Sequence, residues 1–223
     1  MSTISMAQMK KVISFSLWGD NKKYTFGAMR NAELLHKIYP GWEAYFFLGS
    51  SVPDIVWKNL LLLPNITVFY KDSPGDWSSM FWRFETSYDP MVDVSIFRDT
   101  DSRISMREKY AVDEWLSSDK TFHIMRDHPH HGFPILGGMW GYKKNDKYDM
   151  RKLLTSFDKN NRYGTDYEFF GKVLYPMIGE DKIVHDPFFD KKPFPTERID
   201  REFVGDVFDE KGNRHPEYWK YIS

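Results

Sequence analysis

The sequence contains no cysteine. This absence excludes disulfide bonds, thiolate zinc sites, iron–sulfur clusters and a cysteine nucleophile. Neither sign of charge dominates, because 31 lysines and arginines stand against 32 aspartates and glutamates, for a net charge of −1. Such a balance argues against a nucleic-acid binder, which usually carries a basic excess or a basic stripe.

Long apolar runs are also missing. No stretch approaches the roughly 20 apolar residues of a membrane-spanning helix. Residues 1–11 lack the apolar segment that a signal peptide needs. We therefore expect a soluble, cytoplasmic protein without a transmembrane segment, whose oligomeric state the sequence leaves open.

The overall composition is typical of a globular protein, with 41% hydrophobic and 28% charged residues. A length of 223 residues suits one domain over 1–223. Within it we expect a flexible N-terminus at 1–10 and an irregular C-terminal segment at 187–223, packed on the domain. Aromatic residues are abundant at 17%. They indicate either an unusually aromatic core or rings that are presented to a ligand.

The first third of the chain alternates between strand and helix patterns. Apolar runs predict strands at 11–17, 42–48 and 66–70, and helical spacing predicts helices at 24–38 and 53–63. This β-α-β-α-β order is typical of an α/β protein with a mostly parallel central sheet flanked by helices.

Further along, the patterns are shorter. They predict helices at 78–87, 107–117 and 167–174, and strands at 92–97 and 121–125, with another strand opening at 137–141.

Two carboxylates, Asp99 and Asp101, follow the strand at 92–97. Ligands bind at the carboxyl ends of strands in open α/β sheets. Side chains two apart on extended backbone point the same way, so both carboxylates can reach one divalent cation. Oxygen ligands suit Mg²⁺ or Mn²⁺, and the missing thiolates argue against zinc. The alternative is a solvated Asp-x-Asp turn.

Other candidates each have a structural alternative. Arg83, in an aromatic helix, can point to a phosphate or to the carboxylates, or can pack on a ring. Gly137 and Gly138 permit a ligand to approach the backbone, or form a tight turn. Trp140 beside them can stack on a sugar or lie in the core, and Trp18 and Trp82 likewise lie where a base or sugar ring would stack.

Four of the seven histidines lie between residues 123 and 131, and we interpret them as a polar rim, with His128 on the acceptor side. Asp127 beside them is a candidate general base if a neighbour orients it. Asp166 either caps a helix or belongs to the site. His185 either adds a nitrogen ligand to the metal or is a buried histidine.

Together these parts resemble nucleotide-sugar glycosyltransferases of the GT-A fold. The runs 97–103 (FRDTDSR) and 122–129 (FHIMRDHP) are similar to those of small GT-A-like proteins of bacteria and large DNA viruses, chlorella viruses included. The resemblance covers roughly residues 10–210.

The resemblance implies transfer of a sugar from a UDP- or GDP-sugar to a glycan or another hydroxyl acceptor, with Mn²⁺ or Mg²⁺ as cofactor. It implies that Asp99, Asp101 and His185 hold the metal and the diphosphate. The remaining roles are assigned by position. Leu17, Trp18 and Gly19 match the nucleoside site, and Arg83 matches the residue that contacts the sugar-phosphate. Gly137 and Gly138 match the segment that faces the donor sugar and the acceptor. Asp166 or Asp127 matches the catalytic base.

The stereochemical outcome stays open, because Tyr167 stands where retaining members of the family carry glutamine.

Two other functions remain possible from the sequence. Phosphatases of the haloacid-dehalogenase type also end a strand with Asp-x-Asp, but there the motif follows the first strand, and Ser102-Arg103 replaces their usual residues. A module that binds nucleotide sugars or carbohydrate without turnover would carry the same residues.

Overall fold

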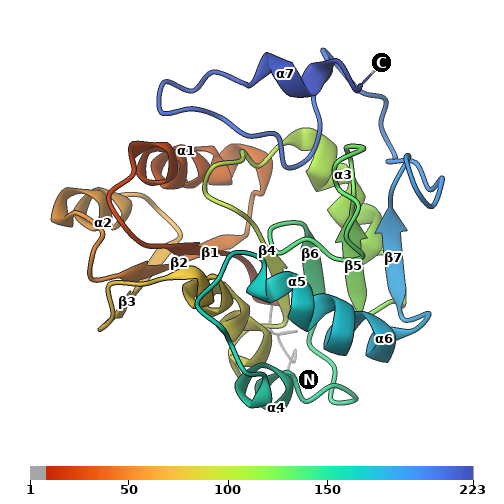
Figure 1. Cartoon of the computed structure of the whole chain (residues 1–223), viewed down its shortest axis with the longest axis horizontal. Helices are drawn as coiled ribbons and strands as arrows, with labels where there is room; N and C mark the ends of the chain where they lie inside the picture. The colour runs from red at the N-terminus through yellow and green to blue at the C-terminus, as the bar shows by residue number, and fades with distance from the viewer. Residues whose placement is uncertain (1–8, 223) are drawn as a thin grey trace, which may run out of the picture.

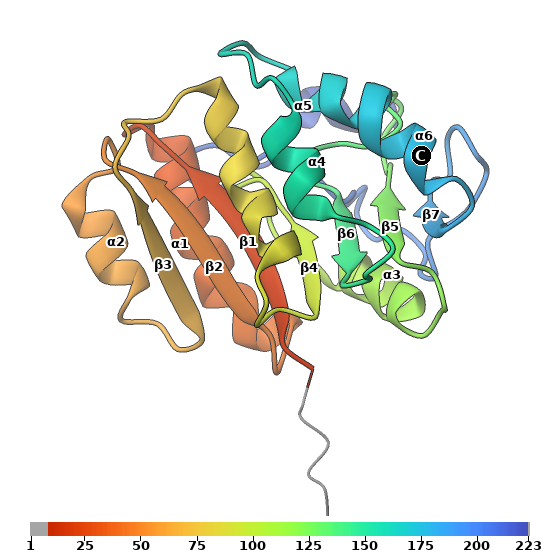
Figure 2. The ribbon, with the colours of Figure 1, turned by 90° about the horizontal axis from the view of Figure 1, so that it is seen from below.

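A computed structural model describes residues 9–222; of the N-terminus that we expect to be flexible (1–10), residues 1–8 lie outside that range. All seven strands form one sheet in the order β3-β2-β1-β4-β6-β5-β7 (Figure 2). The strands are β1 (Lys11–Leu17), β2 (Glu43–Gly49), β3 (Ile66–Lys71), β4 (Val94–Phe97), β5 (Phe122–Met125), β6 (Trp140–Lys143) and β7 (Lys182–His185). The α/β class with a mostly parallel sheet is thus confirmed.

Helices cover both faces of the sheet (Figures 1 and 2). On one face lie α1 (Lys22–Ile38), α2 (Asp54–Leu60) and α3 (Met106–Leu116). On the other lie the 3₁₀ helix η1 (Trp77–Tyr88), α4 (Met150–Ser156), α5 (Thr165–Phe169), the π-helical turn η2 (Phe170–Leu174) and α6 (Tyr175–Ile178). The predicted helix at 167–174 is therefore one part of a longer, irregular helical segment. None of the helices within 9–222 is long and apolar enough to cross a membrane.

The pairing of β1 with β4 positions the site. The two strands are parallel, and Ser14 pairs with Phe97. β6 runs antiparallel to β4 and β5, so it begins at the edge where those two strands end. The segments after β1 and β4 and the glycines before β6 consequently meet at one end of the sheet.

The core is aromatic on the η1 face. Phe84, Phe97, Trp140 and Phe170 contact one another, with centroids of Phe97 and Trp140 4.2 Å apart. Trp140 is 0% exposed, so it belongs to the core. Much of the aromatic excess serves packing, since large rings bury the most apolar area per residue.

After β7 the chain runs irregularly to the short helix α7 (Pro216–Trp219), across the side of the molecule where α1 and α3 lie (Figure 1). Arg198 of this segment forms an ion pair with Asp127 at 2.8 Å. The backbone N–H of Phe208 donates to the carbonyl of Asp101 at 2.9 Å. The C-terminal segment is therefore tied directly to the loop that carries the carboxylate pair.

Candidate active-site cleft

A cleft of about 1210 Å³ opens at the end of the sheet where β1 and β4 finish. Leu17, Trp18 and Gly19 line it from the end of β1, and Asp99 and Asp101 line it from the end of β4. Arg83, Gly137, Asp166 and His128 complete the set of predicted residues that the fold brings there. Segments distant in sequence thus meet around one space.

Asp99 and Asp101 each have a basic partner. Asp99 Oδ1 forms an ion pair with Arg83 Nη1, and Asp101 Oδ2 lies 2.7 Å from Lys23 Nζ. Burial, and the negative charge of Asp99, raise the pKa of Asp101, while Lys23 opposes that rise. The side chain of Asp99 remains 48% exposed, so one carboxylate of the pair is open to the cleft.

Two hydrogen bonds anchor the backbone of Arg83 to β1. The hydroxyl of Ser14 donates to the Arg83 carbonyl at 2.7 Å, and the Arg83 N–H donates to Ser16 Oγ at 2.9 Å. These two serines of β1 fix η1 on the sheet. The guanidinium then reaches Asp99, and its Nη2 lies 3.9 Å from Asp166 Oδ2. Arg83 therefore connects the carboxylate after β4 with the one in α5.

Asp166 lies in the first turn of α5 with a side chain only 3% exposed. Burial raises its pKa, and Arg83 only partly offsets this. Its Oδ1 has no hydrogen-bond partner among residues 9–222. An unpartnered buried oxygen costs free energy, so Asp166, unlike a fully paired structural carboxylate, has acceptor capacity left over.

The two glycines before β6 permit close packing of charged groups. A Cβ on Gly137 would overlap Asp166 Oδ2, and one on Gly138 would overlap the Asp99 carboxylate. Their absent side chains let the loop backbone lie against these carboxylates. Gly137 lines the cleft, whereas Gly138 acts from behind Asp99.

Besides Gly138, three predicted site residues do not line the cleft. Trp140 is in the core. Asp127 is fully buried and accepts hydrogen bonds from Arg107 (2.7 and 2.9 Å), Arg198 (2.8 Å) and the Val204 N–H (2.9 Å). With its oxygens engaged, it has no lone pair directed at a substrate.

His185 lies at the end of β7, away from Asp99 and Asp101. It shares a 2.8 Å hydrogen bond with His123, and burial lowers the pKa of both histidines. His185 is therefore a buried histidine, which was the alternative to its role as a metal ligand. Trp82 packs against a buried hydrophobic cluster and does not line the cleft; the cluster consists of Val12, Tyr45, Phe47 and Val92.

His128 lines the cleft as predicted for the acceptor side. Its Nε2 lies 3.1 Å from the carbonyl of Tyr218, and burial lowers its pKa. Burial also lowers the pKa of His131, to about 3. The lowered pKa of each ring favours its neutral form.

Lys23 was not predicted. It stands in the first turn of α1, and it reaches Asp101 because α1 packs closely on the loop after β4: a Cβ on Gly27 would overlap the carbonyl of Thr100. The only signal in the sequence is a basic residue soon after the first strand, which is too common to single out.

No group of three or more histidine, aspartate or glutamate side chains within the described part of the chain is arranged to hold a metal ion. Asp99 and Asp101 nevertheless suit Mg²⁺ or Mn²⁺ that is shared with a substrate. Such ions often keep several waters and bind through one or two carboxylates plus substrate phosphates. The donor set therefore fits a metal that arrives with a diphosphate.

No protein family and no curated protein matches the sequence. The structure is similar to a glycosyltransferase involved in glycosylating the major capsid of the virus PBCV-1, with a TM-score of 0.54, 15% identity, and coverage of 80% of this chain and 82% of that one.

Two further structures are similar. One is 4-diphosphocytidyl-2C-methyl-D-erythritol synthase from Anaerococcus prevotii, with a TM-score of 0.54, 13% identity, and coverage of 85% and 92%. The other is glucosyl-3-phosphoglycerate synthase from Mycobacterium tuberculosis in complex with Mn²⁺, UDP and phosphoglyceric acid, with a TM-score of 0.51, 12% identity, and coverage of 79% and 68%. At these identities the likeness shows the fold alone, and that fold is GT-A-like.

Proposed function

We propose that this protein is a metal-dependent glycosyltransferase that uses a nucleotide-diphosphate sugar, a UDP- or GDP-sugar, as donor. One observation carries the proposal: Asp99, Asp101, Arg83 and Asp166 meet in one cleft at the carboxyl end of a GT-A-like sheet. The similar structures include glycosyltransferases, one of them bound to Mn²⁺ and UDP. The lack of cysteine suits the reducing cytoplasm, where we place the chain.

Asp99 and Asp101 would hold Mn²⁺ or Mg²⁺ together with the donor diphosphate. When bound, the ion supplies Lewis-acid stabilisation of negative charge on the leaving diphosphate. Arg83 orients Asp99 and adds positive charge beside it. Leu17, Trp18 and Gly19 line the end of the cleft that we assign to the nucleoside.

Asp166 is the residue we assign as general base. The acceptor O–H bond breaks as its oxygen bonds to the sugar C1, the C1–O bond to the diphosphate breaks, and the proton moves to an Asp166 oxygen. A raised pKa suits this role because a base works best when its pKa approaches the working pH. Asp127 drops out of this role because its oxygens are already engaged.

The test is donor hydrolysis by the purified chain, with a panel of nucleotide sugars and Mn²⁺. We expect slow hydrolysis that Asp101→Asn abolishes and Asp119→Asn, at an 88% exposed side chain, leaves unchanged. Equal hydrolysis by Asp101→Asn would sink the metal assignment. An aspartyl-phosphate trapped by beryllium fluoride would favour the phosphatase, and tight binding without hydrolysis or transfer would favour the binding module.

The donor base is found by thermal shift, since a ligand that binds the native state raises its melting temperature. UDP and GDP are each tested with Mn²⁺ and with EDTA, beside inorganic pyrophosphate. A shift that needs both Mn²⁺ and one of the nucleotides identifies the base. Pyrophosphate release from a nucleoside triphosphate would instead indicate nucleotidyl transfer.

A further inference from the structure

Five aromatic side chains form a continuous arc along one rim of the cleft: Trp18, Trp77, Tyr163, Tyr167 and Phe133. Successive ring centroids lie 6.2, 5.2, 6.2 and 4.2 Å apart in that order. We call these five residues the aromatic arc.

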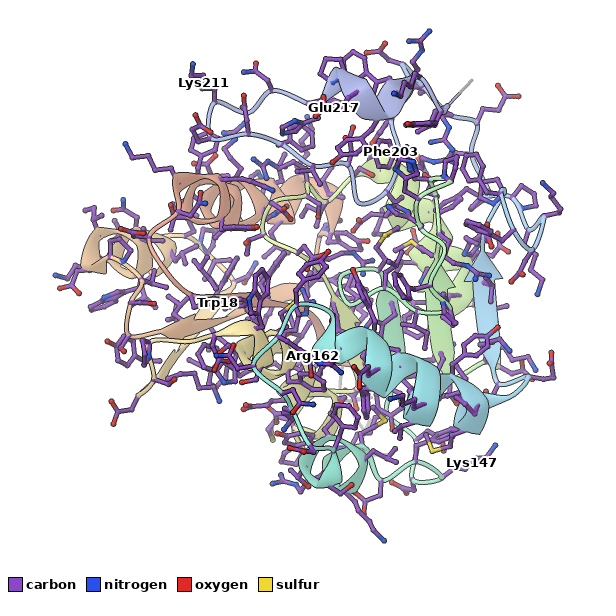
Figure 3. The ribbon with its side chains drawn as sticks, viewed as in Figure 1. Trp18, Lys147, Arg162, Phe203, Lys211 and Glu217 are labelled. Carbon is purple, nitrogen blue, oxygen red and sulfur yellow. The ribbon has the colours of Figure 1, made fainter. Side chains whose placement is uncertain are left out.

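Four separate segments supply the arc. Trp18 follows β1, Trp77 begins η1, Tyr163 and Tyr167 flank the start of α5, and Phe133 lies in the loop after β5. The side chain of Asn161 accepts a hydrogen bond from the Trp77 N–H at 3.2 Å, which ties the loop before α5 to η1. Figure 3 labels Trp18 and, below it, Arg162, the neighbour of Tyr163. The arc is thus built by the fold and does not follow from any one element.

Three rings of the arc are exposed, whereas Trp18 and Tyr167 are half-buried. Trp77 is 41% exposed, Phe133 47% and Tyr163 69%, although the same protein buries most of its phenylalanines. A contiguous exposed apolar surface on a monomer often marks a binding site. This one borders the cleft that holds Asp166, and Tyr167 of the arc is its direct neighbour in α5.

The side chains around the arc indicate which class of ligand fits it. Hydrogen-bonding side chains, among them Asn21, Glu168 and Lys172, line the same cleft. A ligand that fits needs apolar faces to stack on rings and polar edges to meet these groups. Sugar rings have both, since C–H groups cover their faces and hydroxyls their edges. The chain has a net charge of −1 and lacks the excess of basic residues that binding of a nucleic acid would need.

We propose that Trp77, Tyr163, Tyr167 and Phe133 of the aromatic arc form the acceptor site, beside the nucleoside site to which Trp18 belongs. The acceptor is an oligosaccharide whose successive sugar rings stack on these four rings and bring a terminal hydroxyl to Asp166. This inference rests on the proposed function for the direction of transfer. Binding of the saccharide itself needs neither donor nor metal, so it can be tested separately.

The experiment measures saccharide binding to the metal-free chain by tryptophan fluorescence and saturation-transfer NMR. The probes are di- to tetrasaccharides of glucose, galactose and N-acetylglucosamine, in α and β linkage. We expect affinity to rise with chain length. Tyr163→Ala and Trp77→Ala should each weaken binding about 3- to 10-fold, and Tyr163→Phe should retain it. The control, Tyr70→Ala, removes a 59% exposed ring on β3 outside the cleft and should change nothing.

Nucleotide binding separates the possible outcomes. The arc variants should keep wild-type affinity for the nucleotide with Mn²⁺. If they weaken nucleotide binding and leave saccharide binding unchanged, the arc belongs to the donor and the inference is overturned. It is overturned equally if no saccharide of the panel binds. Saccharide binding that depends on the arc, without hydrolysis or transfer of any nucleotide sugar, would sustain the arc and refute the proposed transferase.

Discussion

Asp127 and Asp166 are both deeply buried carboxylates, and they have opposite surroundings. Asp127 accepts hydrogen bonds from Arg107, Arg198 and the Val204 N–H, so its charge is fully compensated. Asp166 has one oxygen without a partner in the described chain and a single guanidinium at 3.9 Å.

The difference shows how to tell a structural carboxylate from a functional one. A buried charge with a full set of donors holds elements together, here the C-terminal segment against α3 and the loop after β5. A buried charge with an empty acceptor position is unfavourable for folding and is kept where a substrate completes it.

The largest effect is expected for Asp166→Asn. Transfer should slow by about 10²- to 10⁴-fold, because the base is lost. Burial raises the pKa of Asp166, so its contribution to stability is present below the ordinary aspartate pKa and is lost as pH rises through the raised value.

The variant should consequently melt at or above the wild-type temperature at pH 7 and lose that advantage in acid, which calorimetry at both pH values would measure. A tenfold or smaller loss of rate, or a clear drop in melting temperature at pH 7, would contradict the assignment.

Asp127→Asn should lower the stability of the protein and leave its rate of transfer nearly unchanged, the opposite of Asp166→Asn. Removing one partner of a buried charge cluster leaves Arg107 and Arg198 undercompensated, which costs about 3–5 kcal/mol in the free energy of unfolding. Urea denaturation measures the loss, with the exposed Asp119→Asn as control. The folded fraction should keep a wild-type rate within a few-fold. A stable but inactive Asp127→Asn would instead make Asp127 the base.

The smallest effect concerns Asp99 and Asp101, which we propose as ligands of the metal. Lys23 lies on Asp101 and competes with a cation for that carboxylate. Lys23→Met should tighten Mn²⁺ binding without nucleotide about two- to fivefold, the scale of a partly exposed ion pair. Titration calorimetry measures it, and Lys58→Met, at an exposed pair with Asp54, serves as control. Unchanged or weaker Mn²⁺ binding would remove Lys23 from the site.

Much of the fold was predictable because its signals are local. The strands and helices up to residue 71 follow from short-range periodicity, and α1 ends at Ile38, the end of the predicted helix at 24–38. Beyond residue 130 the prediction is poorer. The helical segment from Thr165 to Ile178 contains a π-helical turn, and β7 is only four residues long. Such elements are stabilised by tertiary packing and leave little periodic signal.

The three tryptophans expected to face a ligand show the same limit. Trp18, Trp82 and Trp140 all stand near strand or helix ends, but of these only Trp18 lines the cleft. Which way a ring points depends on the strand register and on the helix that packs above it, and neither can be read from neighbouring residues.

By itself, the sequence determined the absence of thiolate ligands, which composition fixes. It also determined the α/β order and the placement of Asp99 and Asp101 after a buried strand, because these depend on residues next to one another in the chain. Tertiary structure decided the rest. It gave Asp101 the partner Lys23, sent Asp127 and His185 into buried networks, and left Asp166 with an open oxygen. These outcomes arise from contacts between segments far apart in sequence, where the available partners decide whether a charged or polar side chain supports the fold or faces a ligand.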